Sequence, residues 1–86
     1  MDLNLKNKKV FVSGSSQGIG LSIAKKFIQE EANVVLNSRN EAYLKKVVAS
    51  MKNCASVSGD LTNPDVASEI IMKAADILVG IDIMVC

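Results

Sequence analysis

Hydrophobic positions along the chain alternate between short apolar runs and stretches with helical spacing. Short runs of the kind found in buried strands occur at 10–12, 33–36 and 81–86, and a weaker one at 55–58. Between them, apolar residues recur every three or four positions, which predicts three amphipathic helices. The expected packed faces are Ile19, Ile23, Ala24, Phe27 and Ile28; Leu44, Val47, Val48 and Met51; and Val66, Ile70, Ile71, Ala74, Ile77 and Leu78.

The third helix has signals at both of its ends. Asn63 is placed as the N-cap and Pro64 as the first helical residue, where a missing N–H has no cost. Gly80 suits the C-terminal stop, because glycine accepts the left-handed backbone found there. These signals predict a helix bounded by Asn63 and Gly80.

The element order is therefore strand, helix, strand, helix, strand, helix, strand. Strands joined by helical crossovers run parallel, and right-handed crossovers place helices on both faces of the sheet. We predict an α/β fold, a partial doubly wound parallel sheet (Rossmann-like) with four strands in the order 3-2-1-4. In that order Cys54 and Cys86 would lie about 14 Å apart, at ~4.8 Å per strand, which is too far for a disulfide.

Composition narrows the functional classes. The chain has 86 residues, enough for one small domain, and ten basic against nine acidic side chains leave a net charge of +1. This balance argues against nucleic acid as a partner, and no apolar run is long enough for a leader or a membrane span. Histidine is absent from the sequence, which excludes His-dependent triads and His-ligated metal sites in this chain. The default compartment is the cytoplasm, where two unpaired cysteines are stable.

The turn after the first strand carries the strongest chemical signal. Gly14 allows a tight turn, Gly18 lets the backbone approach a pyrophosphate, and Gly20 lets the helix pack close to the sheet. Free amides and the positive end of the helix dipole would face the phosphates, and Ser15 and Ser16 add hydroxyl donors. The Lys-Ser/Thr ending of an ATP-binding P-loop is missing. The alternative is that these glycines only end a strand and start a helix.

The turn after the second strand distinguishes the two nicotinamide dinucleotides. NAD sites place an Asp or Glu here to hold the ribose hydroxyls, whereas this turn has no carboxylate before Glu41. Arg39 can instead receive a 2′-phosphate, and Ser38 can hydrogen-bond it. The alternative is a solvated surface arginine. NADP(H) is the predicted cofactor, with NAD(H) less favoured.

Asp60 and Leu61 follow the third strand, at the sheet edge where an adenine ring would lie. Asp60 could accept a hydrogen bond from the adenine amine while Leu61 flanks the ring. Equally, Asp60 could brace the turn before Pro64.

Together these residues resemble the short-chain dehydrogenase/reductase family, and the resemblance covers all 86 residues. Within that family, the sequence is most similar to the 3-oxoacyl-carrier-protein reductases. Ser13-Gly14-x-x-x-Gly18-Ile19-Gly20 is similar to the Thr-Gly-x-x-x-Gly-Ile-Gly signature of the family. Ser38-Arg39 is similar to its NADP-preferring second turn, Gly59-Asp60-Leu61 to its adenine segment, and 81–85 to the strand before its Asn-Asn-Ala-Gly motif.

The sequence also departs from the family pattern. Glu31 stands where the family usually has glycine, Gln17 replaces a basic residue of many NADP-dependent members, and Cys86 stands at the first Asn of Asn-Asn-Ala-Gly. The catalytic Ser, Tyr and Lys implied by the resemblance belong to later elements, so no catalytic residue is assigned here. Tyr43 and Lys46 have a Tyr-x-x-Lys spacing, which we interpret as coincidence.

The resemblance implies that residues 1–86 are the N-terminal part of an NADP-binding Rossmann domain. The activity it implies is hydride transfer between NADPH and a carbonyl or alcohol. The predicted binding residues are Gly14, Ser15, Ser16, Gln17, Gly18, Ile19, Gly20, Ser38, Arg39, Asp60 and Leu61, with no metal site. A small carbonyl or alcohol substrate and homo-oligomerisation are expected only of a full-length form. The alternatives are a non-catalytic NADP(H)-binding module and a non-functional gene fragment.

Overall fold

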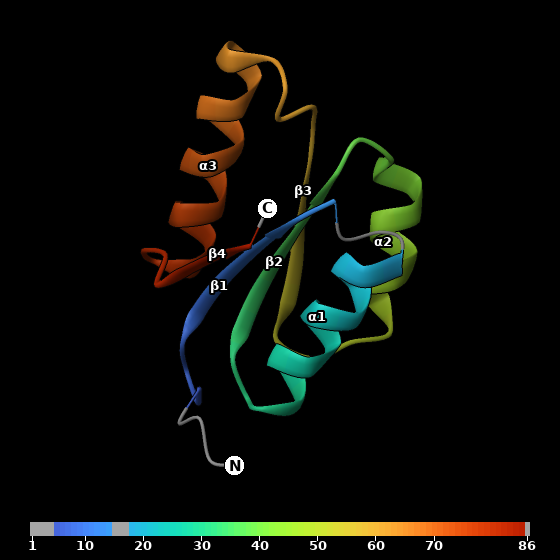
Figure 1. Cartoon of the computed structure of the whole chain (residues 1–86), viewed down its shortest axis with the longest axis vertical. Coiled ribbons are helices and arrows are strands. Elements are labelled where there is room, and N and C mark those ends of the chain that lie inside the picture. The colour runs from blue at the N-terminus through green and yellow to red at the C-terminus, as the bar shows by residue number, and fades with distance from the viewer. Residues whose placement is uncertain (1–4, 15–17, 86) are drawn as a thin grey trace.

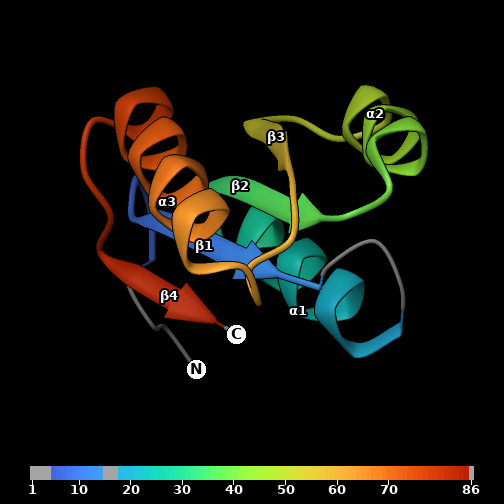
Figure 2. The same ribbon diagram turned by 90° about the horizontal axis from the view of Figure 1, so that it is seen from above.

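A computed structural model describes residues 5–14 and 18–85, which form a single parallel sheet with helices on both faces. The sheet has four strands in the order β3-β2-β1-β4, which confirms the predicted topology (Figures 1 and 2). In chain order the elements are β1 (Lys9–Ser13), α1 (Gly18–Gln29), β2 (Asn33–Ser38), α2 (Glu41–Ala49), β3 (Cys54–Ser58), α3 (Pro64–Leu78) and β4 (Ile83–Val85).

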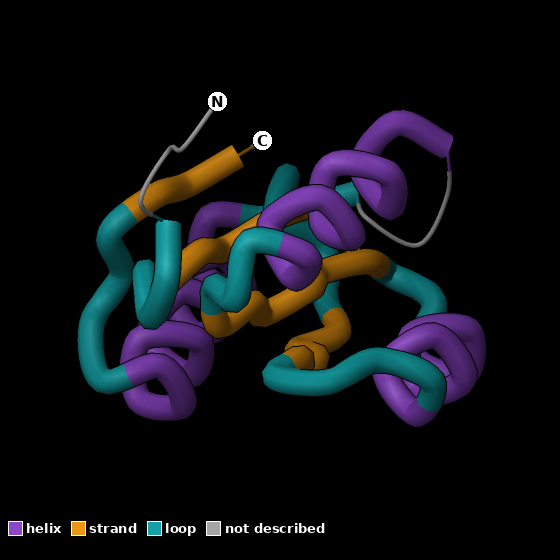
Figure 3. Tube along the Cα trace, turned by 90° about the horizontal axis from the view of Figure 1, so that it is seen from below, coloured by secondary structure: helices purple, strands orange, loops and turns teal. Residues whose placement is uncertain are grey.

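The hydrophobic core is divided by the sheet into two halves, because successive strand residues point to opposite faces. On one face Val10 and Val12 of β1 pack with Ala24 of α1 and Leu44 of α2. On the other face Phe11 packs with residues of α3, including Ala74. Figure 3, seen from below, shows the strands lying between helices on either side, as Figure 2 does from above. Burial on both faces explains why the central strands are continuous apolar runs.

The boundaries of two strands, the inner strand β2 and the edge strand β4, differ from the predicted ones. β2 continues through two polar residues, Asn37 and Ser38, because both pair in register with β3, opposite Val57 and Ser58. β4 is shorter than predicted and begins at Ile83, since the Asp82 carboxylate accepts a 2.9 Å hydrogen bond from the backbone N–H of Lys9 before the ladder starts. The predicted end of β2 at Leu36 was therefore two residues too early, because the polar residues Asn37 and Ser38 belong to the strand.

The ends of α3 confirm one signal and correct the other. Asn63 Oδ1 accepts hydrogen bonds from the N–H groups of Asp65 and Val66, and Pro64 is the first helical residue, as predicted. The stop comes one residue earlier than predicted, because Val79, at φ +59°, is the left-handed cap. Gly80 follows at φ +107°, and its N–H donates to the Ala75 carbonyl at 2.8 Å.

Two residues predicted to lie on packed helix faces are exposed. Ile19 is 80% exposed, because the packed face of α1 centres on Ala24 and a residue five positions away is rotated by roughly 140°. Ile77 is 50% exposed. It lines a hollow together with Ser56 and Ser58 of β3, and β3 is an edge strand with no further strand beside it in the described sheet. None of the helices among the described residues is long and apolar enough to cross a membrane.

Candidate functional site

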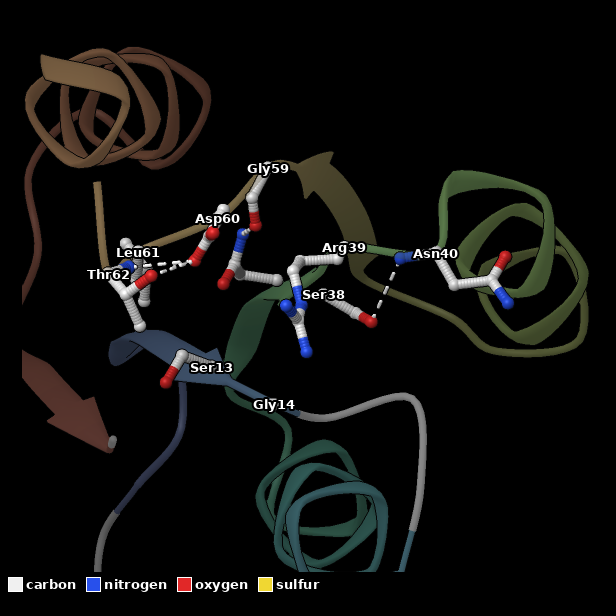
Figure 4. A pocket seen from close by; sticks show the side chains of 10 residues that line it. Ser13, Gly14, Ser38, Arg39, Asn40, Gly59, Asp60, Leu61 and Thr62 are labelled. Carbon is white, nitrogen blue, oxygen red and sulfur yellow. Dashed lines mark hydrogen bonds between the residues drawn. The ribbon is translucent and has the colours of Figure 1, made fainter.

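A cavity of about 430 Å³ opens at the carboxyl ends of the first three strands (Figure 4). Three turns that are distant in the sequence line it, and we call it the carboxyl-edge pocket. Parallel strands bring all of their carboxyl ends to one edge, which is where ligands bind in open α/β sheets. Its lining residues are Ser13, Gly14, Asn37, Ser38, Arg39, Asn40, Gly59, Asp60, Leu61 and Thr62.

The first turn has the backbone geometry that its glycines predicted. Gly14 and Gly18 have φ values of +63° and +54°, in the left-handed region that favours glycine. A Cβ atom added at either position would meet no atom of residues 5–14 and 18–85 within 4 Å, so none of these residues fills the space beside either glycine. The first turn of α1 contains no acidic residue that would offset the positive end of its dipole. Ser15, Ser16 and Gln17 lie outside the described residues, and Gly20 lies in the first turn of α1.

The second turn places Arg39 against the pocket. Figure 4 shows its guanidinium reaching from the end of β2 toward the side where Gly14 lies. Ser38 Oγ accepts a 3.2 Å hydrogen bond from the N–H of Asn40, and Asn40 Oδ1 accepts one of 3.0 Å from the N–H of Tyr43. These bonds hold the turn against the start of α2, so the backbone beside Arg39 is fixed although its side chain is exposed.

The third turn orients a carboxylate by hydrogen bonds. Asp60 Oδ1 accepts from the Thr62 hydroxyl at 2.6 Å and from the Thr62 N–H at 2.9 Å. The hydroxyl bond first, then the N–H bond, and more weakly the charge of Arg39 hold the pKa of Asp60 below its usual range. Asp60 thus braces the turn, which was the alternative interpretation, while Oδ2 has no hydrogen-bond partner among the described residues.

The fold also brings together residues that sequence reasoning did not combine. Arg39 has no acid in its own turn, as expected, but the carboxylate of Asp60 lies close enough for their charges to interact. Five lining residues of the pocket were not among the predicted binding residues: Ser13, Asn37, Asn40, Gly59 and Thr62. An asparagine inside an otherwise apolar strand was the signal that could have identified Asn37.

The other candidate groups lie elsewhere. Tyr43 and Lys46 are exposed on α2 and do not line the pocket, in agreement with a coincidental spacing. Burial raises the pKa of the Cys54 thiol to about 11, so this residue is a poor nucleophile. Cys54 forms no disulfide within the described part, and Cys86 lies outside it.

The carboxyl-edge pocket has the size of a small-molecule site and a mixed polar and apolar lining. Its volume is within the range of about 300–1,000 Å³ usual for small-molecule sites. Its lining includes a positive charge at Arg39, a carboxylate at Asp60 and an apolar side chain at Leu61. Beside Gly14 and Gly18, no described residue comes within 4 Å of where a Cβ would lie.

Comparison with known proteins agrees with this geometry. The family model described as short chain dehydrogenase matches residues 8–86. The chain belongs to the short-chain dehydrogenase family. It is 39% identical over 88 residues to the uncharacterised oxidoreductase YvrD of Bacillus subtilis, covering 99% of this chain and 33% of that protein. It is 34% identical over 87 residues to glucose 1-dehydrogenase of Gluconobacter oxydans, covering 92% of this chain and 32% of that protein.

Solved structures of short-chain reductases share the fold. The L-sorbose reductase of Gluconobacter frateurii, in complex with NADPH and L-sorbose, matches 98% of this chain with a TM-score of 0.92 and 30% identity. The 3-ketoacyl-(acyl-carrier-protein) reductase of Brucella melitensis, in complex with NADH, matches 93% with a TM-score of 0.87 and 23% identity, a likeness of fold. The matches cover 34% and 33% of those chains, so this chain spans about a third of the length of its relatives.

Proposed function

We propose that residues 1–86 form the N-terminal, cofactor-binding part of an NADP(H)-dependent short-chain oxidoreductase that interconverts a carbonyl and an alcohol. The observation that carries this proposal is the carboxyl-edge pocket, where Gly14, Arg39 and Asp60 arrive from three separate turns. Support also comes from the sorbose reductase, which is 30% identical and was solved with NADPH and L-sorbose. The bound cofactor would supply the hydride chemistry.

The residues of this chain would hold the adenosine and diphosphate ends of the cofactor. Backbone amides at the start of α1 bind the diphosphate, because Gly14 and Gly18 leave the approach open. Oδ2 of Asp60 accepts from the adenine amine, and Leu61 covers one face of the ring. Ser15, Ser16, Gln17, Ile19 and Gly20 stay predicted contacts of the same turn.

Arg39 would provide the preference for NADP(H) over NAD(H). A charge-assisted hydrogen bond to a phosphate contributes about 1.5–3 kcal/mol, roughly a 10- to 150-fold difference in affinity. Ser38 adds a hydroxyl at the same turn, and the ionised Asp60 directs the phosphate to the arginine side of the pocket by repulsion. The adenosine 2′-phosphate would therefore lie beside Arg39.

The remaining parts of the proposal concern a longer protein. Substrate binding and the catalytic Ser, Tyr and Lys would come from elements that this chain does not contain. We place that protein in the cytoplasm, as a homo-oligomer that acts on a small carbonyl or alcohol.

The test is a titration of the chain with NADPH and with NADH, followed by cofactor fluorescence. NADPH should bind at least tenfold more tightly. Arg39→Ala should remove most of this difference. Lys45→Ala is the matched control, since it removes an equal charge from the exposed Lys45–Glu41 pair on α2 outside the pocket. Equal affinities of the unsubstituted chain for the two cofactors would refute the NADP(H) assignment.

A further inference from the structure

Asn37 differs from every other residue of the sheet core. Only 3% of its surface is exposed, and it is the one polar or charged residue counted as buried within 5–14 and 18–85. It lies near the carboxyl end of β2, between Ser13 of β1 and Val57 of β3 in the register. A buried amide is costly unless its hydrogen-bonding groups are satisfied, so its presence requires a structural or functional reason.

The Asn37 amide group ties the exit of β3 to β2. Nδ2 donates to the Val57 carbonyl at 2.9 Å and to the Gly59 carbonyl at 3.4 Å. The backbone adds a third bond, from the N–H of Gly59 to the Ser38 carbonyl at 3.0 Å. Both side-chain bonds therefore end on the two carbonyl groups that frame the start of the turn leading to Asp60.

The opposite side of this turn is held by α3. A Cβ atom at Gly59 would lie 2.6 Å from Ile70 Cδ1 and 3.2 Å from Val66 Cγ1, so the backbone passes directly over the helix. Gly59 is thus confined between α3 and the Asn37 amide. Asp60 and Leu61 come next in the chain, and Figure 4 shows both beside Gly59 on one wall of the pocket.

We propose that Asn37 is a positioning residue for adenosine recognition, acting through Gly59 to set the wall formed by Asp60 and Leu61. This inference rests on the proposed function. An amide suits the role because it offers two N–H donors on one nitrogen. Leucine has similar size but no donor, and serine has one donor on a shorter side chain that cannot span both carbonyls.

The experiment compares Asn37→Leu and Asn37→Ser with the unsubstituted chain. The ligands are 5′-AMP and adenosine 2′,5′-bisphosphate, which differ only in the 2′-phosphate, titrated by NMR and corrected for the folded fraction measured by circular dichroism. Asn37→Leu should bind both nucleotides about tenfold more weakly and leave the ratio of their affinities unchanged, and Asn37→Ser should fall between. Arg39→Ala should weaken the bisphosphate alone.

The control for a purely structural effect is Val34→Ala on the same strand. Val34 is buried at the amino end of β2, away from the pocket, so this variant should lose stability and keep its nucleotide affinity per folded molecule. A measurement on the unsubstituted chain covers the case in which the Asn37 variants do not fold. On addition of 5′-AMP, the side-chain amide signal of Asn37 should shift, whereas that of Asn33, at the other end of β2, should not.

Two results would overturn the inference separately from the proposed function. Unchanged affinity for 5′-AMP in the folded fraction of Asn37→Leu would show that Asn37 acts on stability alone. An unshifted Asn37 amide signal at saturating 5′-AMP would do the same. If the unsubstituted chain binds neither nucleotide nor NADPH, the proposed function fails, and this inference fails with it.

Discussion

The two ends of the sheet use the left-handed backbone differently. At the carboxyl end, where the pocket lies, the positive φ values among residues 5–14 and 18–85 fall on glycine, at Gly14, Gly18 and Gly59. At the amino end, the turns that enter the strands place positive φ on side-chain-bearing residues as well, at Asn7, Glu31, Asn53 and Val79. The same backbone conformation therefore occurs without a side chain near the pocket and with one at the opposite end of the sheet.

The difference shows what each glycine is for. A side chain at φ near +60° costs about 1–2 kcal/mol, which the amino-end turns tolerate because nothing has to approach them. At Gly14 and Gly18 no described atom fills the space beside the backbone, so packing against the described residues does not require glycine at either position. Gly59 is different, because a Cβ there would collide with Ile70. The carboxyl end thus contains two glycines suited to a ligand and one required by α3.

The largest expected effect belongs to Gly59→Ala. Overpacking against Ile70 and a strained φ of +147° should lower the free energy of unfolding by about 2–4 kcal/mol, measured by urea denaturation. The matched test is Ile70→Val, which deletes the Cδ1 atom nearest to the new Cβ. It should cost less in the Gly59→Ala background than in the unsubstituted chain. Strict additivity of the two changes would contradict the collision.

Gly18→Ala should separate binding from stability. The new methyl group meets no described protein atom but occupies the space through which a diphosphate would approach, so NADPH affinity should fall by about tenfold. Gly80→Ala is the control at the amino end, where φ is also positive and the nearest atom is 4.0 Å away. That variant should lose stability and bind NADPH unchanged. An equal loss of binding in both variants would remove the distinction between the two ends.

Replacing the amino-end side chains by glycine should stabilise the protein. Val79→Gly and Glu31→Gly relieve backbone strain at φ +59° and +66°, and each should raise the free energy of unfolding by about 0.5–1 kcal/mol. Little packing is lost, since Val79 is 77% exposed and the Glu31–Lys6 pair is long and solvated. Thermal unfolding would show the gain. Glu30→Gly, whose φ is not positive, should give none.

The smallest expected effect concerns the pKa of Asp60. The Thr62 hydroxyl and N–H hold this pKa below its usual value, so the carboxylate favours the folded state above the unfolded pKa of about 3.9. That contribution is lost as the pH falls through the folded pKa. Thr62→Val should raise the Asp60 pKa, followed by NMR titration of its carboxyl carbon, and should shift the acid loss of stability to higher pH. An unchanged Asp60 pKa would assign the shift to the Thr62 N–H, which valine retains, and to Arg39.

Local signals in the sequence predicted several features of the fold. Asn63-Pro64 predicted the start of α3, and the alternation of elements predicted the strand order. Ile19 was wrongly predicted to be packed. Its spacing fits the apolar face of α1, but the sheet does not cover that face at the start of the helix. β2 extended past Leu36 because both of its neighbours continue beside it, which no local pattern records.

The amino-acid sequence by itself determined the order of strands and helices, the parallel sheet and the glycine turn, since these depend on periodicity and on residues near one another in the chain. Tertiary structure decided what surrounds the pocket. The register of β2 against β3 gives the Asn37 amide its two carbonyl partners. The carboxyl ends of β2 and β3 lie side by side, which brings the charges of Arg39 and Asp60 close enough to interact. Hydrogen bonds and charge interactions act over a few ångströms, and only the folded chain sets those distances.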